Sequence, residues 1–351
     1  MKEARGRHTQ MEVREEVKEE VTEIRQPRKE GATLAGVVDR AVIAAPKTGF
    51  QPAHCVICEG LIDCQAEIDP AVGGLFDTRF GIAGAFEVRR CRSCELEQLS
   101  PLPAPAELKT LYERYYNFSG ERGTVYTVLR EWFFSSPLYR LWIRLDEDIS
   151  FHTRRGRGRL LDIGCNEGRT LKNYARNGFQ AEGTELNETA AAVAREAGFA
   201  VFTGALEDFA PAQPYDVAVL SNVLEHALDP RAMLRSVDRL LGSGGQVWIH
   251  ITHFSPRTLR HLLEASGFSH IEIRQITPAL WVASSIIARL FARPGKPTRQ
   301  LRNPLLVFAL VLACRTLLFP LLYWGNRAGR GDCLVAVASK AAGSPTRGCE
   351  I

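Results

Sequence analysis

The sequence has no strong excess of charge and no uninterrupted apolar run long enough to cross a membrane. Its 351 residues carry 44 Lys and Arg against 40 Asp and Glu, a net charge of +4 that argues against nucleic acid as a partner. No apolar segment follows the charges at the N-terminus, so we expect no secretory signal and a cytoplasmic protein. With 45% apolar residues, the chain is long enough for one large domain and a smaller unit.

The first segment has few large apolar side chains. Residues 1 to about 30 alternate acids and bases, and we expect the segment 1–49 to be charged and disordered, with no assigned function. Composition and prolines divide the rest of the chain into six parts. These are a cysteine-bearing module at 50–103, a helical linker or lid at 104–158, an α/β domain at 159–277, an apolar insertion at 278–331, a last strand at 332–341 and a tail at 342–351.

Cysteine is not scarce, and its spacing is informative. Among nine cysteines, Cys55, Cys58, Cys91 and Cys94 form two C-x-x-C pairs with 32 residues between the pairs. Disulfides are rare in a reducing compartment, so the spacing favours a metal held by four thiolates. Such a site is tetrahedral and closed, which makes it structural rather than catalytic. Four unliganded cysteines are the alternative, because the spacing between the pairs is longer than in most fingers.

From Arg159 onwards, apolar strand-like runs alternate with helical patterns such as "ETAAAVAREAG" and "SPRTLRHLLEASG". The strand-like runs are "RLLDIG", "QAEGTEL", "FAVFTG", "YDVAVLSN", "GQVWIHI", "HIEIRQI" and, after the insertion, "DCLVAVASKA". This alternation predicts an α/β fold in which a mostly parallel sheet is covered by helices on both faces.

The first of these strands leads into "RLLDIGCNEGRTL", which lacks the glycine pattern of a dinucleotide site. Asn166 and Arg169 stand where that pattern needs glycine. The acid within the strand, Asp162, is a poor neighbour for phosphates. The segment therefore suits a cationic ligand better than a pyrophosphate.

Two glycines and a second acid complete this pattern. Gly164 and Gly168 allow a sharp turn and a close approach of the backbone to a ligand. Glu185 ends the next strand, 23 residues after Asp162. A carboxylate at that position can accept hydrogen bonds from both ribose hydroxyls of an adenosine.

In these residues the chain resembles the class I S-adenosylmethionine-dependent methyltransferases. "LLDIGCNEG" is similar to their first motif, "GTEL" to their second-strand acid, "YDVAVLSNVLEHALDP" to their fourth-strand motif and "RLLGSGGQVWIHI" to the turn into strand five. The resemblance implies a Rossmann-like sheet of seven strands, with the last one antiparallel, and S-adenosylmethionine as cofactor. "CRSCELEQLSPLPAPAELKTLYERYY" also resembles one branch of the family, in which a small zinc-binding module with four cysteines precedes the catalytic domain.

The resemblance implies roles for residues that follow the strands. Asp162 would organise the loop around the methionine part of the cofactor, and Glu185 would hold the ribose. Glu207 and Asp208 lie where the family often has an acid and an amide beside the adenine, although the usual acid position is Ala205. The expected cofactor-binding residues are Asp162, Gly164, Cys165, Asn166, Gly168, Glu185, Leu186, Glu207, Asp208 and Asn222.

The segment "SNVLEHALDP" supplies the expected catalytic residues, His226 and Glu225. Methyl transfer from a sulfonium needs orientation and, for a hydroxyl acceptor, a base, which an imidazole can provide near neutral pH. Relatives with E-x-x-E-H here bind a divalent metal, but Asn222 replaces the first Glu, which argues against metal-assisted chemistry. The alternative for His226 is a hydrogen bond within its own loop. Asp229 before Pro230 is typical of a helix N-cap.

The insertion is far too apolar for an ordinary loop. Its stretch from Pro304 to Trp324 approaches the ~20 residues of a membrane span, but Arg315 lies at the middle and Pro320 interrupts it. Flanking arginines and aromatic residues favour a hairpin in the membrane interface. A buried helical pair in a dimer interface or a cap is the alternative.

Together these features predict an S-adenosylmethionine-dependent methyltransferase with a structural Zn²⁺. The insertion favours a small or lipid-linked acceptor, such as a sugar, glycolipid or quinone-type precursor methylated on oxygen or carbon. It also favours peripheral contact with the inner face of the membrane. One alternative is an RNA methyltransferase that uses the basic cluster at 154–159, although the weak net charge argues against it. The other is a catalytically silent scaffold that binds the cofactor.

Overall fold

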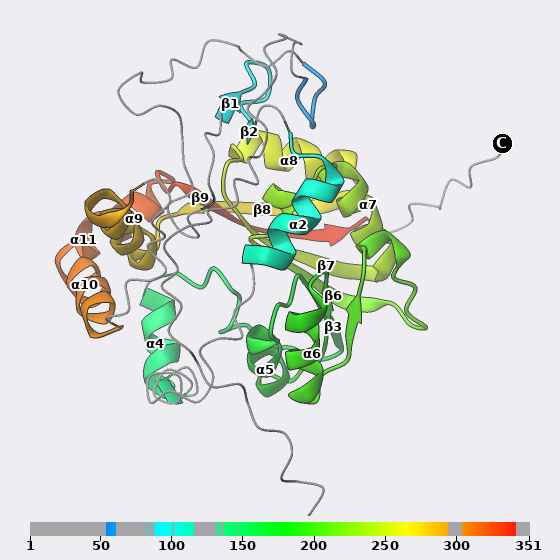
Figure 1. Cartoon of the computed structure of the whole chain (residues 1–351), viewed down its shortest axis with the longest axis horizontal. Helices are drawn as coiled ribbons and strands as arrows, with labels where there is room; N and C mark the ends of the chain where they lie inside the picture. The colour runs from blue at the N-terminus through cyan, green and yellow to red at the C-terminus, as the bar shows by residue number, and fades with distance from the viewer. Residues whose placement is uncertain are drawn as a thin grey trace, which may run out of the picture. The chain divides into compact units, whose positions relative to one another are not determined.

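The computed structural model describes most of the chain from His54 onwards (Figure 1). The described residues are 54–60, 82, 88–99, 102–115, 132–133, 136–145, 147–293 and 304–341, except for the side chains of 114, 115, 304–308 and 311. The expectations for the segment at 1–49 and for the tail at 342–351 lie outside these residues.

Seven strands form one mixed sheet. They are β3 (Arg159–Ile163), β4 (Gln180–Glu185), β5 (Val201–Thr203), β6 (Tyr215–Ser221), β7 (Leu241–Ile251), β8 (Phe268–Ile276) and β9 (Cys333–Lys340). Their order is β5-β4-β3-β6-β7-β9-β8, in which β9 is antiparallel to both neighbours and the pairs from β5 to β7 are parallel. The order reverses between β3 and β6, where open α/β sheets bind ligands. The sheet confirms the Rossmann-like fold expected from the sequence.

Helices cover both faces of this sheet, because side chains of buried strands alternate between the faces. They are α5 (Arg169–Arg176), α6 (Glu188–Glu196), α7 (Pro230–Leu240) and α8 (Pro256–Ala265), with single 3-10 turns η2 (Leu206–Asp208) and η3 (Leu224–His226). One core joins Leu161 and Ile249 to α7 and α8. The core of the other face joins Leu160 and Trp248 to Tyr174 of α5.

Short polar residues begin three of these helices. The side chains of Asn187, Asp229 and Ser255 accept hydrogen bonds from backbone N–H groups at the starts of α6, α7 and α8. Pro230 and Pro256 follow directly, at positions where the missing N–H has no partner in the helix. The expected N-cap at Asp229 is confirmed.

The two C-x-x-C pairs lie in a small unit before the sheet. Its strands β1 (Val88–Arg90) and β2 (Glu97–Leu99) are antiparallel, and α2 (Pro105–Tyr115) and α4 (Pro137–Leu145) follow along the chain. Within each pair the backbone makes the same turn: Glu59 N donates to Cys55 O over 2.9 Å, and Glu95 N donates to Cys91 O over 2.8 Å. Buried residues of this unit belong to the core that α7 and α8 cover.

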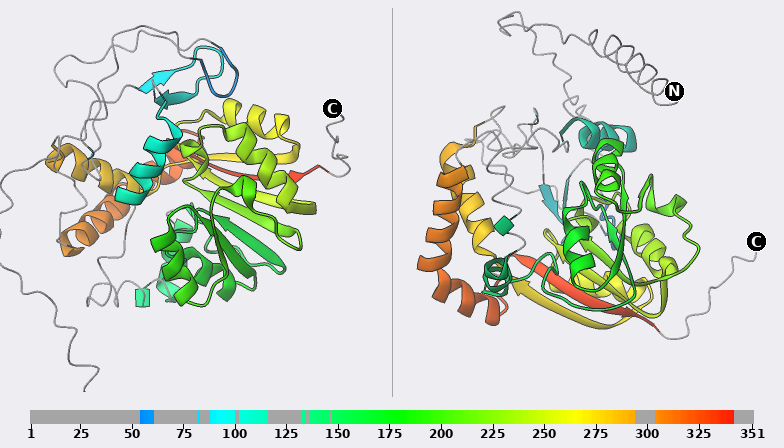
Figure 2. Two further views of the ribbon diagram at one scale, coloured as in Figure 1. Left: turned by 45° about the vertical axis from the view of Figure 1, so that its right-hand side comes forward. Right: turned by 90° about the horizontal axis from the view of Figure 1, so that it is seen from below.

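The described residues of the insertion form three helices rather than a two-helix hairpin. They are α9 (Ala279–Phe291), α10 (Pro304–Leu317) and α11 (Phe319–Arg327), with Pro320 in the first turn of α11. Among the described residues, no helix is both long and apolar enough to cross a membrane. Figures 1 and 2 show the three helices together beyond the β9 and β8 side of the sheet.

The topology fixes the edge of the sheet at which the insertion begins. Because β9 is antiparallel to β7 and to β8, β8 runs parallel to β7. The chain therefore leaves β8 for α9, and enters β9 after α11, at the edge where the parallel strands end. This is the edge that carries the loops after β3, β4 and β6.

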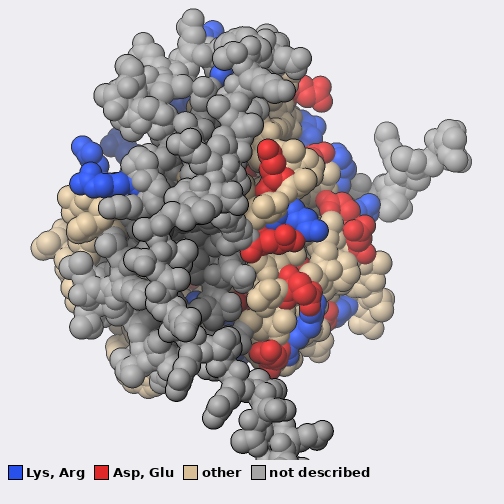
Figure 3. Space-filling view, in the orientation of Figure 1, with Lys and Arg blue, Asp and Glu red and all other residues tan. Residues whose placement is uncertain are grey.

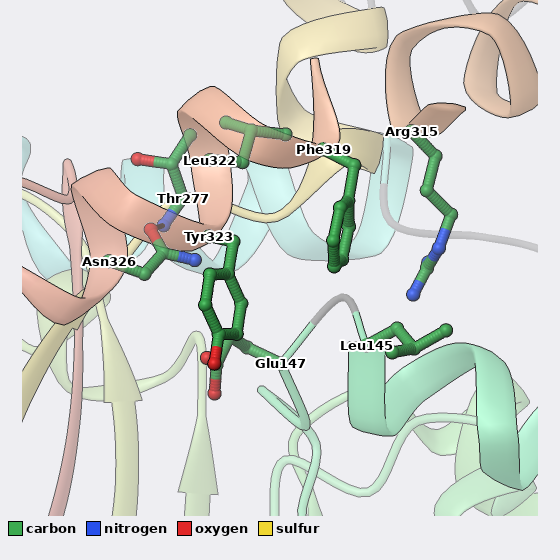
Figure 4. Close-up of a pocket in the computed structure, with 8 residues that line it drawn as sticks. All are labelled: Leu145, Glu147, Thr277, Arg315, Phe319, Leu322, Tyr323 and Asn326. Atoms are coloured by element: carbon green, nitrogen blue, oxygen red, sulfur yellow. Dashed lines mark hydrogen bonds between the residues drawn. The ribbon is translucent and has the colours of Figure 1, made fainter. Parts of the chain in front are cut away.

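Figure 4 shows the seam between α4 and the insertion, which is lined by Leu145, Glu147, Thr277, Arg315, Phe319, Leu322, Tyr323 and Asn326. The Arg315 guanidinium lies 4.0 Å from the ring centroid of Trp142 and donates a hydrogen bond to its carbonyl oxygen. Arg315 is therefore buried against α4 and is not exposed at the middle of an apolar span. Asn326 accepts a hydrogen bond from Thr277 N over 2.8 Å, which fixes the end of α11 to the end of β8.

Candidate active site

The loop after β3 makes two left-handed turns around glycine. Gly164 has φ +72° and Gly168 has φ +74°, and a Cβ at either position would lie within 3.0 Å of a neighbouring side chain. Only glycine fits such positions without strain. Between them, Cys165 is buried and Asn166 has φ 51°. The backbone of this loop is thus held close to the end of β3.

Asp162 lies beneath this loop and is 3% exposed. Its carboxylate accepts a hydrogen bond from the Thr170 hydroxyl of α5. Burial raises the pKa of Asp162 to about 7, the neighbouring Glu185 adds to this rise, and the Thr170 hydrogen bond opposes it. A cation placed near this carboxylate would favour the ionised form.

Glu185 joins the glycine loop to the loop after β4. One carboxylate oxygen accepts a hydrogen bond from Asn166 N over 2.8 Å, and the other accepts one from Asn187 N over 2.9 Å. Each oxygen retains a further lone pair for a ligand hydroxyl. Next to it, the side chain of Leu186 is 57% exposed. An exposed leucine beside a carboxylate offers a flat ligand one apolar face and one polar edge.

Helix α2 contacts the loop after β4 and the loop after β6. Tyr112 accepts a hydrogen bond from Asn187 Nδ2 at its carbonyl oxygen over 3.3 Å. Its ring meets the ring of His226 edge-on, with centroids 6.4 Å apart. The residues that follow the cysteine unit therefore touch the loops after β4 and β6.

The expected adenine contacts lie further along the edge. Glu207 and Asp208 form η2 after β5, and both are exposed. Asn222, after β6, is also exposed, has φ 56° and donates its backbone N–H to His250 O over 2.9 Å. The ten expected cofactor residues thus occupy the ends of β3, β4, β5 and β6 at one edge of the sheet.

Glu225 and His226 form η3, directly after this turn. Burial raises the pKa of Glu225 to about 7, against hydrogen bonds from Thr252 that lower it. Its Oε2 atom is buried and accepts no hydrogen bond from the described residues. The His226 ring reaches solvent on one side, while desolvation by the atoms around its other sides and the nearby His253 lower its pKa to about 4. His226 is therefore neutral at pH 7 and able to accept a proton.

The four cysteines of the two pairs come together in space. Their sulfur atoms all lie within 4.8 Å of one another, with Cys55 and Cys94 Sγ 3.5 Å apart and Cys58 and Cys91 Sγ 3.5 Å apart. These spacings suit four thiolates around one ion with Zn–S bonds of about 2.3 Å. The residues required for a closed tetrahedral site are present.

Known proteins are similar to the part of the chain that forms these strand ends. Residues 134–250 match a family described as a methyltransferase domain. The ubiquinone biosynthesis O-methyltransferase of Pseudomonas aeruginosa (strain LESB58) is 34% identical over 174 residues, which cover 47% of this chain and 68% of the relative. The chain belongs to the class I S-adenosylmethionine-dependent methyltransferases. Its cofactor is S-adenosylmethionine, as the sequence motifs predict.

Other matches are shorter or lie in the fold alone. The ubiquinone biosynthesis O-methyltransferase of Sodalis glossinidius is 33% identical over 106 residues, which cover 28% of this chain and 43% of the relative. A solved methyltransferase of Thermotoga maritima, described as a possible histamine N-methyltransferase, aligns with a TM-score of 0.38 and 18% identity over 67% of this chain and all of that one. The magnesium protoporphyrin IX methyltransferase of Synechocystis aligns with a TM-score of 0.40 and 14% identity over 68% of this chain and all of that one.

The motifs of this methyltransferase do not include every polar residue at the edge. Thr252, which hydrogen-bonds Glu225, and Asn187, which contacts both Glu185 and Tyr112, lie outside them. His250 is a buried imidazole in the apolar strand β7. A histidine within the run "VWIHI" is the one signal in the sequence that distinguishes it.

Proposed function

We propose that this methyltransferase methylates a hydroxyl oxygen or a carbon of an amphipathic acceptor, of the quinone-type or lipid-linked class, at a membrane surface. The observation that carries the proposal is the position of the insertion, which begins and ends at the edge of the sheet that bears the glycine loop and η3. An acceptor can keep an apolar tail on the insertion while its polar head reaches that edge. The names of the curated relatives support a quinone-type head.

The cofactor is held, in this proposal, by the loops after β3, β4 and β6. Asp162 orients the glycine loop and balances the positive sulfonium, which is why a buried acid is tolerated there. Glu185 accepts the ribose hydroxyls through its remaining lone pairs. Leu186 packs on the adenine, and Glu207, Asp208 and Asn222 line the open sides.

The residues of η3 act on the acceptor. S-adenosylmethionine supplies an activated methyl group, so the chain itself has to orient the acceptor and, for a hydroxyl, take up its proton. His226 receives this proton because its ring is neutral at pH 7. Glu225 and Thr252 fix the loop next to it. The O–CH₃ bond forms as the S–CH₃ bond breaks, and His226 then releases the proton to solvent.

The surface of the insertion fits an anionic lipid bilayer. Residues 278–331 contain eight Lys and Arg and no Asp or Glu. Exposed Arg289, Arg293, Arg327 and Arg330 flank exposed apolar side chains of α9 to α11. Figure 3 shows basic and uncharged residues on the side of the insertion, whereas acidic and basic side chains are mixed on the opposite side. Arginine beside exposed leucine and tryptophan is typical of helices that lie in a membrane interface.

The four cysteines hold, in this proposal, a structural Zn²⁺. Their sulfur atoms converge, and all of Cys55, Cys91 and Cys94 are buried in the same core as α7 and α8. A closed site of this kind contributes to folding and leaves no open position for chemistry. Metal analysis of the purified protein should find one zinc per chain.

Calorimetry tests the cofactor site. We expect S-adenosylmethionine to bind in the micromolar range, on the order of −8 kcal/mol. The double variant Asp162→Ala, Glu185→Ala should lose this binding, while Glu196→Ala, which changes an exposed acid at the end of α6, should retain it. Binding without methyl transfer to any acceptor would favour the silent scaffold, and absence of binding to the folded wild-type protein would contradict the cofactor site.

A transfer assay tests the acceptor. Tritiated S-adenosylmethionine is incubated with the protein and a chloroform–methanol extract of bacterial membranes, and labelled lipid is counted in the organic phase. We expect label in the lipid for the wild-type chain and none for the double variant. Label in an added RNA fraction, together with steep salt dependence of RNA binding, would support the RNA methyltransferase instead.

A further inference from the structure

One histidine near the candidate active site has no structural reason to be polar. His250 of β7 is 0% exposed, and neither ring nitrogen makes a hydrogen bond with the described residues. Burial lowers its pKa to about 4, so the ring is neutral. A buried polar group left without a partner is destabilising, and an apolar side chain of similar size would avoid this loss.

The strand register puts His250 next to the cofactor edge. Asp162 pairs with Val219, and Val219 pairs with Trp248, so these three lie in one row across the sheet. His250 lies two residues further towards the carboxyl edge and on the same face as Trp248, because side chains alternate along a strand. β7 is two strands from β3, a separation of about 10 Å.

The backbone of His250 contacts the loop that carries the proposed catalytic residues. The carbonyl oxygen of His250 accepts the hydrogen bond from Asn222 N over 2.9 Å, which fixes the turn before η3. Two residues on, Thr252 hydrogen-bonds Glu225. The backbone of His250 is therefore joined to the loop that carries the proposed catalytic residues.

The insertion covers the ring. Trp281, in the first turn of α9, meets His250 at a centroid distance of 5.9 Å and an interplanar angle of 67°. Trp281 is only partly buried, so part of the residue is exposed. An acceptor that approaches along α9 thus meets an aromatic plane first and an unpaired imidazole behind it.

We propose that His250 recognises the acceptor, through a hydrogen bond from an acceptor hydroxyl to its unprotonated ring nitrogen, with Trp281 packing on the acceptor's apolar ring. This inference rests on the proposed function and adds the residue that selects a hydroxyl-bearing head group. Binding requires the Trp281 side chain to move off the imidazole, since both cannot contact it from the same side.

The test compares three variants in the transfer assay with limiting membrane extract, where the initial rate is proportional to kcat/KM. His250→Phe should lower this rate about 10- to 100-fold, as expected for the loss of a buried hydrogen bond to substrate. His250→Asn, which keeps an acceptor atom, should recover part of it. Val335→Ala, which alters packing on the strand position paired with His250, should stay within about threefold of wild type.

S-adenosylmethionine affinity separates recognition from damage to the fold. We expect all three variants to bind the cofactor within about twofold of wild type, and His250→Phe to melt no lower than wild type because it removes an unpaired polar group. A His250→Phe variant that retains the wild-type rate overturns the inference. So does an equal loss of rate in Val335→Ala, since that would make packing the cause.

A wild-type protein that labels no lipid would mean that the proposed acceptor class is wrong. In that case the inference is judged by the histidine ring resonances of the protein saturated with S-adenosylhomocysteine, with 4-octylcatechol as probe. The resonance that is absent from His250→Phe should shift when the probe is added. An unchanged resonance at millimolar probe overturns the inference.

Discussion

The cysteine unit and the apolar insertion are both additions to one sheet, but they are joined to it differently. The cysteine unit shares the core of the catalytic domain, to which it contributes Cys55, Ile57 and Leu96. Hydrogen bonds tie it further: Arg231 of α7 donates to Ile57 O, and the Thr258 hydroxyl of α8 donates to Cys94 O. Among the described residues of this unit, few large apolar side chains are left for another partner.

The insertion has a small core of its own, made by Ala279, Ala283 and Cys314. Large apolar side chains remain outside this core, namely Leu317 at 79%, Leu321 at 71% and Trp324 at 68% exposure. The comparison separates a part that shares the core of the catalytic domain from a part whose large apolar side chains remain exposed.

The largest effect is expected from the metal site of the cysteine unit. Cys94→Ser removes one thiolate from a buried site, so the unfolding free energy should fall by about 3–5 kcal/mol and the melting temperature by about 10 °C. Thermal unfolding measures both of these quantities, and zinc analysis shows whether the metal is lost. Cys64→Ser, in the same segment but outside the two pairs, should match wild type. Equal stability of the two variants would mean that no bound metal stabilises the cysteine unit.

Substitutions in the insertion should instead weaken binding to vesicles and leave the stability of the fold unchanged. Replacing Leu317, Leu321 and Trp324 by Glu should weaken flotation with phosphatidylglycerol vesicles about 100-fold, because apolar contact is lost and like charge is added. The melting temperature should stay within about 2 °C of wild type, since these side chains are already exposed. Leu102→Glu, an exposed leucine before α2, should float like wild type. A triple variant that unfolds would show that the two regions do not differ as described.

The glycine loop after β3, which lies between the two regions in the sequence, gives a pH-dependent effect. Because Asp162 has a pKa raised to about 7, its proton has to leave before a cationic cofactor is accommodated. S-adenosylmethionine affinity should therefore weaken as pH falls below 7, by up to about tenfold per pH unit, and level off above 7. Calorimetry from pH 5 to 8 measures this. Asp162→Asn should bind weakly and show no such slope; a slope that persists there would assign it to another group.

The smallest effect sharpens the comparison with single arginines. Arg231→Ala should lower the unfolding free energy by about 1–2 kcal/mol, because it leaves the buried carbonyl of Ile57 without its donors. Arg327→Ala, on exposed α11, should change it by no more than about 0.5 kcal/mol. Chemical denaturation of both variants measures the two losses in unfolding free energy. Equal losses would mean that the insertion is tied as firmly as the cysteine unit.

Much of the catalytic domain could be predicted because its signals are local. Gly164, Gly168 and Asp229 lie where their backbone conformation or capping chemistry requires them, and each is readable from a few neighbouring residues. The seven strands and the antiparallel direction of the last one followed from the resemblance to the family. The number of helices in the insertion was not predicted, because a uniformly apolar run carries no period that marks where one helix ends.

The sequence by itself determined the fold class, the cofactor family and the residue types at the strand ends, since strand alternation, glycine turns and C-x-x-C spacing act over short distances. Only the tertiary structure decided which distant groups meet. It buried Arg315 against Trp142, covered His250 with Trp281 and put the insertion at the cofactor edge. Such contacts depend on strand order and on long-range packing, in which burial of apolar surface selects partners that no local pattern encodes.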